Sequence, residues 1–174
     1  PAVIAETLEG RIHKGRLLEE SFGHEAKQLL DQTRNVHIIA CGTSYHAGLV
    51  AKYWLEDAGI PCSVEVASEY RYRRVVVPPG TLFLTISQSG ETADTLAALR
   101  ASNRAGYLGS ITVCNVPESS LVRESNVALM TRAGPEIGVA STKAFTTQLV
   151  ALRLVTLALA RRNGQTAGDR KSVV

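Results

Sequence analysis

The chain has 174 residues, which is enough to bury the core of one domain, and its aliphatic residues dominate over 5% aromatic ones, as is typical of α/β domains. Its 19 basic and 16 acidic residues leave a net charge of +3, and the basic residues are scattered apart from Arg71–Arg74, so nucleic-acid binding is not expected. The sequence has neither a signal-peptide pattern nor an apolar run near the roughly 18 residues that span a bilayer. We therefore expect a soluble cytoplasmic protein without a membrane partner.

Short β-branched runs alternate with longer helical patterns along the chain. Apolar residues at helical spacing predict two helices at the start, at residues 2–13 and about 22–33. Apolar runs then predict five strands, at residues 36–42, 62–68, 81–87, 109–115 and 126–131. Between and after the strands we expect helices, with Ser44 capping the first of them, at residues 44–58, 92–105, 117–125 and 142–162, and a short charged helix or turn at 69–74.

Five strands separated by helices predict an α/β fold with a doubly wound parallel sheet, because parallel neighbours need long crossover connections and the helices supply them. We expect residues 1–34 to form N-terminal helices, residues 35–163 to form the ligand-binding domain, and residues 164–174 to form a flexible tail. Ligands of such sheets bind beyond the carboxyl ends of the strands, near the point where the strand order reverses.

Polar turns follow three of the predicted strands. They read "CGTS" at residues 41–44, "SQSGET" at residues 87–92 and "GPEIGVASTK" at residues 134–143. Because the carboxyl ends of parallel strands meet at one edge of the sheet, we expect the three turns to face one crevice.

The "SQSGET" turn has the chemistry of a phosphate site. It combines hydroxyl groups, an amide and a glycine before a predicted helix start, whose free N–H groups and dipole attract anions; these residues are Ser87, Gln88, Ser89, Gly90 and Thr92. The turn has no Lys or Arg, and GxxxxGK[ST] is absent, so a monophosphate is favoured over a triphosphate with Mg²⁺. The alternative is that Ser89 and Thr92 only cap a helix.

The other two turns favour a ligand over capping. Thr43 and Ser44 begin a second predicted helix, and Ser141, Thr142 and Lys143 begin a third, with the carbonyl of Val139 nearby. Three hydroxyl-rich helix starts at one edge suit a polyhydroxy, phosphorylated ligand. Capping accounts for each turn separately but not for their number.

Metal and thiol chemistry find little support in the sequence. The three cysteines adjoin or lie within strand-like runs without metal-ligand spacing, and the four histidines fall in separate segments without an HExxH pattern. We expect buried structural cysteines, no metal and no other cofactor.

Several motifs resemble one known family. The runs "ACGTSYHAG", "EYRYR", "ISQSGETADTLAALR", "CNVPESSLVRES" and "GPEIGVASTKAFTTQL" resemble the sugar isomerase (SIS) domain of the isomerising glutamine:fructose-6-phosphate aminotransferases, or glucosamine-6-phosphate synthases. The resemblance covers nearly all of the chain. "SQSGETADT" together with "EIGVASTKAFTTQ" is similar to this family more specifically than to other sugar-phosphate-binding proteins of the superfamily.

The resemblance implies a binding role for eight residues. Ser87, Ser89 and Thr92 would hold the phosphate with help from Gln88. Thr43 and Ser44 would contact the sugar and phosphate region, and Val139 and Ser141 would contact the hydroxyl or amino end of the ligand. Glu136 and Lys143 lie in the same motif and are assigned no catalytic step.

The resemblance also implies a reaction and partners. Members of the family convert fructose 6-phosphate and glutamine to glucosamine 6-phosphate and glutamate, and two SIS domains pair in a homodimer. This chain resembles only the first of two SIS subdomains, without the glutaminase domain and without the second subdomain that carries the catalytic base. Since Pro1 also replaces an initiator Met, we expect a fragment of a longer enzyme that binds sugar phosphate and does not turn it over.

Two other functions remain open from the residues alone. A non-catalytic phosphosugar sensor would have the same fold, but no convincing basic helix-turn-helix precedes Val36. A nucleotide-binding domain would place Glu65 near a ribose. However, "GTSYHAG" is not GxGxxG, and Glu65 is interpreted as an ordinary exposed strand residue.

Overall fold

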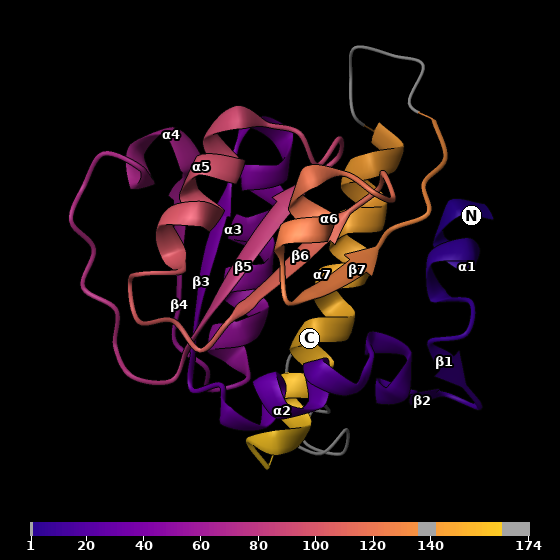
Figure 1. Cartoon of the computed structure of the whole chain (residues 1–174). Coiled ribbons are helices and arrows are strands. Elements are labelled where there is room, and N and C mark those ends of the chain that lie inside the picture. Colours follow the sequence, from indigo (N-terminus) through magenta and orange to yellow (C-terminus); the bar gives the residue numbers. More distant parts are fainter. Residues whose placement is uncertain (1, 136–141, 165–174) are drawn as a thin grey trace.

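A five-stranded parallel sheet forms the centre of the computed structural model, which describes residues 2–135 and 142–164. Each strand pairs in parallel with its neighbours. In spatial order the strands are β4 (Cys62–Val66), β3 (Asn35–Ala40), β5 (Thr81–Ser87), β6 (Ser110–Cys114) and β7 (Val127–Met130). The prediction of an α/β fold with a doubly wound parallel sheet is confirmed (Figure 1).

Helices cover both faces of this sheet (Figure 1). The long helices α3 (Gly42–Asp57) and α7 (Thr142–Arg162) pack on one face, and α4 (Ala67–Tyr70), α5 (Ala93–Ser102) and α6 (Ser120–Glu124) pack on the other. Strand β5 is buried along its whole length, so its alternating side chains supply two separate cores. Leu84 joins the core under α3 and α7, whereas Phe83 joins the core under α4 and α5.

Helix α7 has the bounds that its apolar pattern predicts, Thr142–Arg162. Of the helices that the structure describes, it alone has the length and composition to cross a bilayer, and 61% of its apolar window is buried inside the protein. Its buried residues include Leu152, Leu154 and Leu159, which belong to the core shared with α3. The apolar stretch therefore packs within this protein on more than one side.

The N-terminal segment differs from the two predicted helices. Helix α1 (Ala2–Leu8) ends earlier than expected, because Gly10 adopts a positive φ of 73°. The predicted first helix, residues 2–13, is therefore wrong beyond Leu8. A hairpin follows, with Lys14 and Gly15 both at positive φ, as its two-residue turn requires. The remaining elements are β1 (Ile12–His13), β2 (Arg16–Leu17), η1 (Glu19–Phe22) and α2 (His24–Gln32).

Two side chains of the N-terminal segment fasten it to the end of β7. The guanidinium of Arg11 donates to the carbonyl of Met130 at 2.6 Å and to that of Thr7 at 3.0 Å, and the Thr7 hydroxyl donates to the Thr131 carbonyl. Burial, together with the nearby Arg132 charge, lowers the pKa of Arg11 to about 10. Helix α1 is thus held at the carboxyl edge of the sheet.

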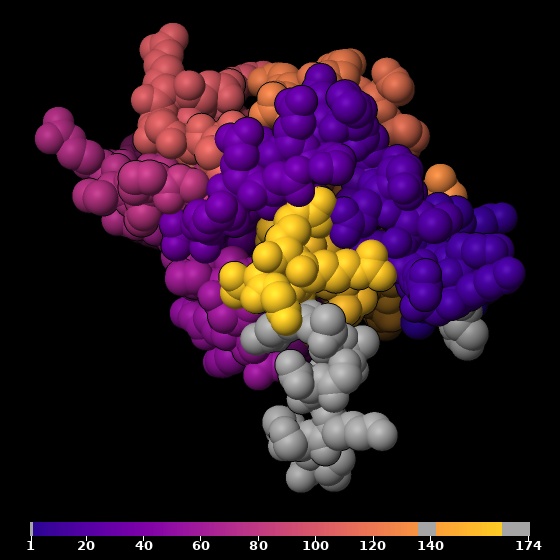
Figure 2. Space-filling view, turned by 90° about the horizontal axis from the view of Figure 1, so that it is seen from below, coloured from indigo at the N-terminus to yellow at the C-terminus, as the bar shows by residue number. Residues whose placement is uncertain are grey.

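The same segment encloses the far end of α7. Arg162 pairs with Asp31 at 2.7 Å and with Glu19 at 2.7 Å, and Arg161 donates to the carbonyl of Leu17 at 3.2 Å. Figure 2 shows this end of α7, in yellow, bordered by the indigo N-terminal elements. These contacts join residues 17–31 to the C-terminal end of α7.

A polar cluster is buried beside β3 and β4. His37 is 5% exposed, and its Nδ1 lies 2.7 Å from the Tyr107 hydroxyl while its Nε2 lies 3.3 Å from a Glu65 carboxylate oxygen. Arg73 binds the same carboxylate through both of its oxygens, and the Tyr70 ring packs edge-on against the imidazole. Glu65 is therefore a paired, half-buried residue, so its interpretation as an ordinary exposed strand residue is wrong.

One helical glycine sets how closely α3 approaches the sheet. A Cβ atom on Gly48 would lie 2.9 Å from Cγ2 of Ile38 and 3.2 Å from Cγ1 of Val64. Only a residue without a side chain fits between this helix and the strands β3 and β4. Helix α3 is thereby held close against β3 and β4 at Gly48.

Gly48→Val is expected to lower the free energy of unfolding by about 1–3 kcal/mol, because the added methyl groups overpack the contact with Ile38 and Val64. Urea titration measures the change. The control is Tyr53→Val in the same helix, where the wild-type side chain is 71% exposed. Equal stability of Gly48→Val and wild type would contradict the close packing.

His37 is expected to make stability fall in acid. Burial lowers the pKa of His37 despite the opposing Glu65 carboxylate, so the unfolded chain binds the proton at higher pH than the folded one. Stability contributed by neutral His37 is therefore complete above a pH of about 6.5 and is lost progressively below it. His37→Gln should flatten the decline in unfolding free energy between about pH 7 and 5, measured by urea titration beside the exposed control His24→Gln. An unchanged slope would refute this assignment.

Candidate functional site

A cavity of about 220 Å³ lies at the carboxyl ends of β3 and β5. After β3 the chain passes to β4 on one side, and β5 returns on the other side, so the strand order reverses here. Such a reversal leaves a crevice where α/β proteins bind ligands. Six of the eight predicted site residues line the cavity, together with Cys41 and Ile86: Thr43, Ser44, Ser87, Gln88, Ser89 and Thr92.

The turn at residues 87–92 orients two serine hydroxyls. The Gly90 N–H donates to Ser87 Oγ at 3.0 Å, and the Glu91 N–H donates to Ser89 Oγ at 3.2 Å. Each Oγ thus receives a backbone hydrogen bond and can donate its own hydrogen, Ser87 either to a ligand in the cavity or to the Thr92 hydroxyl. Ser87 Oγ also lies 3.3 Å from the hydroxyl oxygen of Thr92.

Two helices begin at this cavity. Thr92 is the N-cap residue of α5 and Cys41 is that of α3, and neither makes a side-chain capping hydrogen bond. The first-turn N–H groups of a helix have no partner within the helix, and they carry the positive end of its dipole. Capping therefore does not account for the hydroxyls at these two helix starts, and both ends favour an anion.

Ser44 takes a different position from the expected one. Helix α3 begins at Gly42, so Ser44 lies within its first turn, and the prediction that it caps this helix is wrong. Its hydroxyl oxygen instead accepts a hydrogen bond at 3.0 Å from Nε2 of Gln148, which is 2% exposed on α7. Sequence reasoning missed Gln148, although a glutamine within an otherwise apolar helix is the signal of a buried polar contact.

The described lining of the cavity is polar but has no charged side chain. Among its described lining residues there is no carboxylate, imidazole, ammonium or guanidinium group. Hydroxyls, one amide and two helix ends are the donors present, and they suit a phosphate monoester. Lys143 is exposed near the start of α7 and does not line the described cavity. Glu136, Val139 and Ser141 lie outside the described residues, so the third polar turn stays a prediction.

Gly90 seats the turn against the segment after β6. Its φ is +70°, and a Cβ atom there would lie 2.0 Å from Ser119 Oγ and 2.5 Å from Ser119 Cβ. The Leu121 N–H donates to the Gly90 carbonyl at 3.1 Å, and the Asn115 N–H donates to the Gln88 carbonyl at 3.3 Å.

A larger cavity, of about 610 Å³, adjoins the first one. Gln88 lines both of them. Apart from Glu6, Asn115 and Arg132, the rest of its described lining is glycine, proline, valine and methionine. This composition offers a phosphate few donors, so the smaller cavity is the better candidate for the anion.

The chain is similar to known proteins along most of its length. The family model of the SIS domain matches residues 29–158. An isomerizing glutamine-fructose-6-phosphate aminotransferase of Pseudomonas putida is 66% identical over 165 residues, which are 94% of this chain and 27% of the relative. The enzyme of the same name from Idiomarina loihiensis is 55% identical over 100% of this chain and 29% of its own length.

A solved structure gives the same result. The C-terminal domain of glucosamine-fructose-6-phosphate aminotransferase from Francisella tularensis superposes with a TM-score of 0.93 at 55% identity, covering 97% of this chain and 47% of that one. The chain thus spans about a quarter of the length of the curated relatives that it matches. Because the SIS family model covers most of the sequence, this chain belongs to the SIS domain family.

Proposed function

We propose that this chain is the phosphosugar-binding SIS subdomain of an isomerising glutamine:fructose-6-phosphate aminotransferase. The observation that carries the proposal is the turn at residues 87–92, whose two serine hydroxyls accept backbone hydrogen bonds and can donate their own hydrogens to a ligand. The turn lies at the start of α5, where the helix end also favours a phosphate. The similarity to aminotransferases of this name supports the choice of sugar phosphate.

The proposed ligand is fructose 6-phosphate or glucosamine 6-phosphate. Ser87, Ser89 and Thr92 would donate to the phosphate oxygens, and Gln88 would add its amide. Thr43 and Ser44, on the opposite side of the cavity, would contact the sugar. Val139 and Ser141 are proposed to contact the hydroxyl or amino end of the ligand.

The proposed whole enzyme joins ammonia to a ketose. Glutamine is hydrolysed to glutamate and ammonia, the ammonia condenses with the carbonyl of open-chain fructose 6-phosphate with loss of water, and a proton moves between neighbouring carbons to give glucosamine 6-phosphate. The proton transfer needs a general base. Since no carboxylate, imidazole or amine is among the described lining residues, this chain would bind and orient the sugar phosphate without turning it over.

The base would come from other parts of the longer enzyme. We propose a glutaminase domain and a second SIS subdomain in the same polypeptide, association into a homodimer, and a cytoplasmic location. The lengths of the relatives support the additional domains, because this chain covers 27% of one relative and 47% of a solved C-terminal domain.

Removing one hydroxyl tests the phosphate site. Ser89→Ala is expected to raise the Kd for glucosamine 6-phosphate roughly tenfold or more, because a hydrogen bond to a charged group contributes about 1.5–3 kcal/mol. An NMR titration measures the Kd, with glucosamine and inorganic phosphate as ligand controls. Ser21→Ala, at an exposed serine of η1, is the matched protein control. No binding to the folded wild-type chain, or equal Kd values for wild type and Ser89→Ala, would refute the proposal.

The close packing of Gly90 against Ser119 can be tested separately. Gly90→Ala combines a strained positive φ with a collision against Ser119, so both stability and phosphosugar affinity should fall. Gly106→Ala is the control, because Gly106 also has a positive φ but would place its Cβ in open space. The control is expected to lose stability by about 1–2 kcal/mol and to keep its Kd. If both variants keep the wild-type Kd, the seating of Gly90 has no part in binding.

A further inference from the structure

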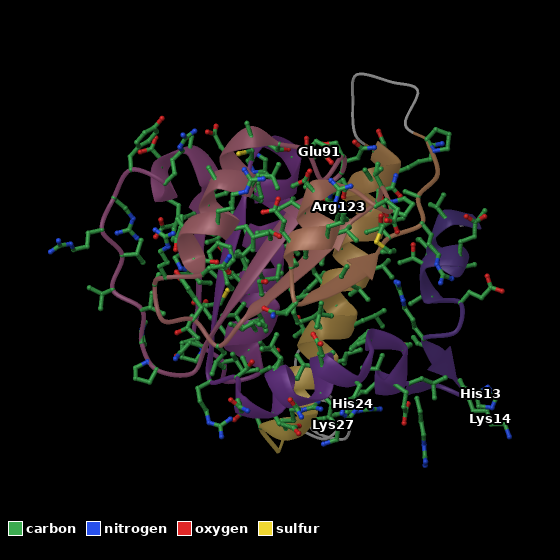
Figure 3. All side chains as sticks on the ribbon, viewed as in Figure 1. His13, Lys14, His24, Lys27, Glu91 and Arg123 are labelled. Atoms are coloured by element: carbon green, nitrogen blue, oxygen red, sulfur yellow. The ribbon has the colours of Figure 1, made fainter. Side chains whose placement is uncertain are left out.

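A carboxylate outside the cavity links the turn at residues 87–92 to α6. Glu91 Oε1 accepts a hydrogen bond from the Ser120 N–H at 2.7 Å, and Glu91 Oε2 accepts one from the Ser120 hydroxyl at 2.8 Å. Figure 3 labels Glu91 at the upper end of the molecule, above Arg123 of α6. Both oxygens of one side chain therefore bind a residue 29 positions further along the chain.

This contact replaces a cap that α6 lacks. Ser119 is the N-cap residue of α6 and makes no side-chain capping hydrogen bond, whereas the Glu91 carboxylate binds the N–H of Ser120, the first residue of the helix. The Ser120 N–H and, after it, the Ser120 hydroxyl lower the pKa of Glu91, and the Arg123 charge acts in the same direction. The link is thus made by an ionised carboxylate at neutral pH.

The backbone of Glu91 connects this link to the proposed phosphate donors. Its N–H donates to Ser89 Oγ at 3.2 Å, and its neighbour Gly90 donates to Ser87 Oγ at 3.0 Å. The side chain of one residue therefore holds α6 while its main chain holds a cavity hydroxyl. A shift of Glu91 would change the direction of the Ser89 hydroxyl.

We propose that Glu91 is a positioning residue, which fixes the turn at residues 87–92 to α6 and so presents the Ser87 and Ser89 hydroxyls to the phosphate. The inference rests on the function proposed above and deepens it. Glu91 does not line the cavity, and its charge has the same sign as that of phosphate. Charge alone would make its removal strengthen binding, whereas loss of positioning would weaken it.

The opposite signs make a direct test. Glu91→Ala removes both hydrogen bonds to Ser120 and should raise the Kd for glucosamine 6-phosphate about tenfold, as expected when a binding hydrogen bond is misdirected. Glu91→Gln loses the charge but keeps an acceptor for the Ser120 N–H, so it should recover most of the affinity. An unchanged or lower Kd for Glu91→Ala would overturn the inference.

A matched control separates positioning from general loss of stability. Glu124→Ala removes a carboxylate of α6 that also accepts two hydrogen bonds. Both come from Arg100 of α5, at 2.8 Å and 2.6 Å, and neither involves the turn. This variant should keep the wild-type Kd. If it loses as much affinity as Glu91→Ala, the effect belongs to the packing of α6 and the positioning role is wrong.

A double variant tests the route through Ser89. If Glu91 acts by directing that hydroxyl, Glu91→Ala should raise the Kd by a smaller factor in a Ser89→Ala background than in the wild type. Equal factors in the two backgrounds would contradict action through Ser89. A wild-type chain that binds and a Ser89→Ala variant that binds weakly, with an unaffected Glu91→Ala variant, would overturn this inference alone. Absence of binding to the wild type would overturn the proposed function and this inference with it.

Discussion

The register between β3 and β5 determines the geometry of the ligand edge. Ala40 lies opposite Ile86, so the two strands end at the same level and their turns begin side by side. The chain leaves β3 toward β4, on the side of β3 away from β5. This leaves a crevice at the carboxyl ends of β3 and β5. Gly48 then lets α3 lie close to the sheet, which brings Thr43 and Ser44 across the cavity from the turn at residues 87–92.

For the proposed phosphate ligand, this arrangement offers oriented dipoles as donors. Each serine oxygen of the turn is occupied on one side by a backbone N–H, so the direction of its own hydrogen is restricted before a ligand arrives. Preorganised neutral donors at helix ends have little rearrangement to undergo on binding. Such donors require a precisely positioned turn, and its contacts at Gly90, Ser119 and Ser120 hold it in place.

The spacing of apolar residues was enough to predict most of the strands and helices. The five strands and α7 were recognisable because their apolar runs have the period of the element and clear ends. The hairpin was missed because the apolar spacing before it continues that of α1, and only Lys14 and Gly15 carry the turn signal. Six residues that line the cavity could be expected there from hydroxyl-rich turns and a family resemblance. The partners of Gln148 and Ser120 could not be predicted, because they lie far away in the sequence and only the folded chain brings them together.

The attachment of α1 has a consequence for effective concentration. Arg11 and Thr7 hold this helix against the end of β7. Glu6 lines the larger cavity together with Gln88 of the turn at residues 87–92. A polypeptide joined ahead of Ala2 would therefore begin close to this cavity. A short linker would keep it there at a high local concentration.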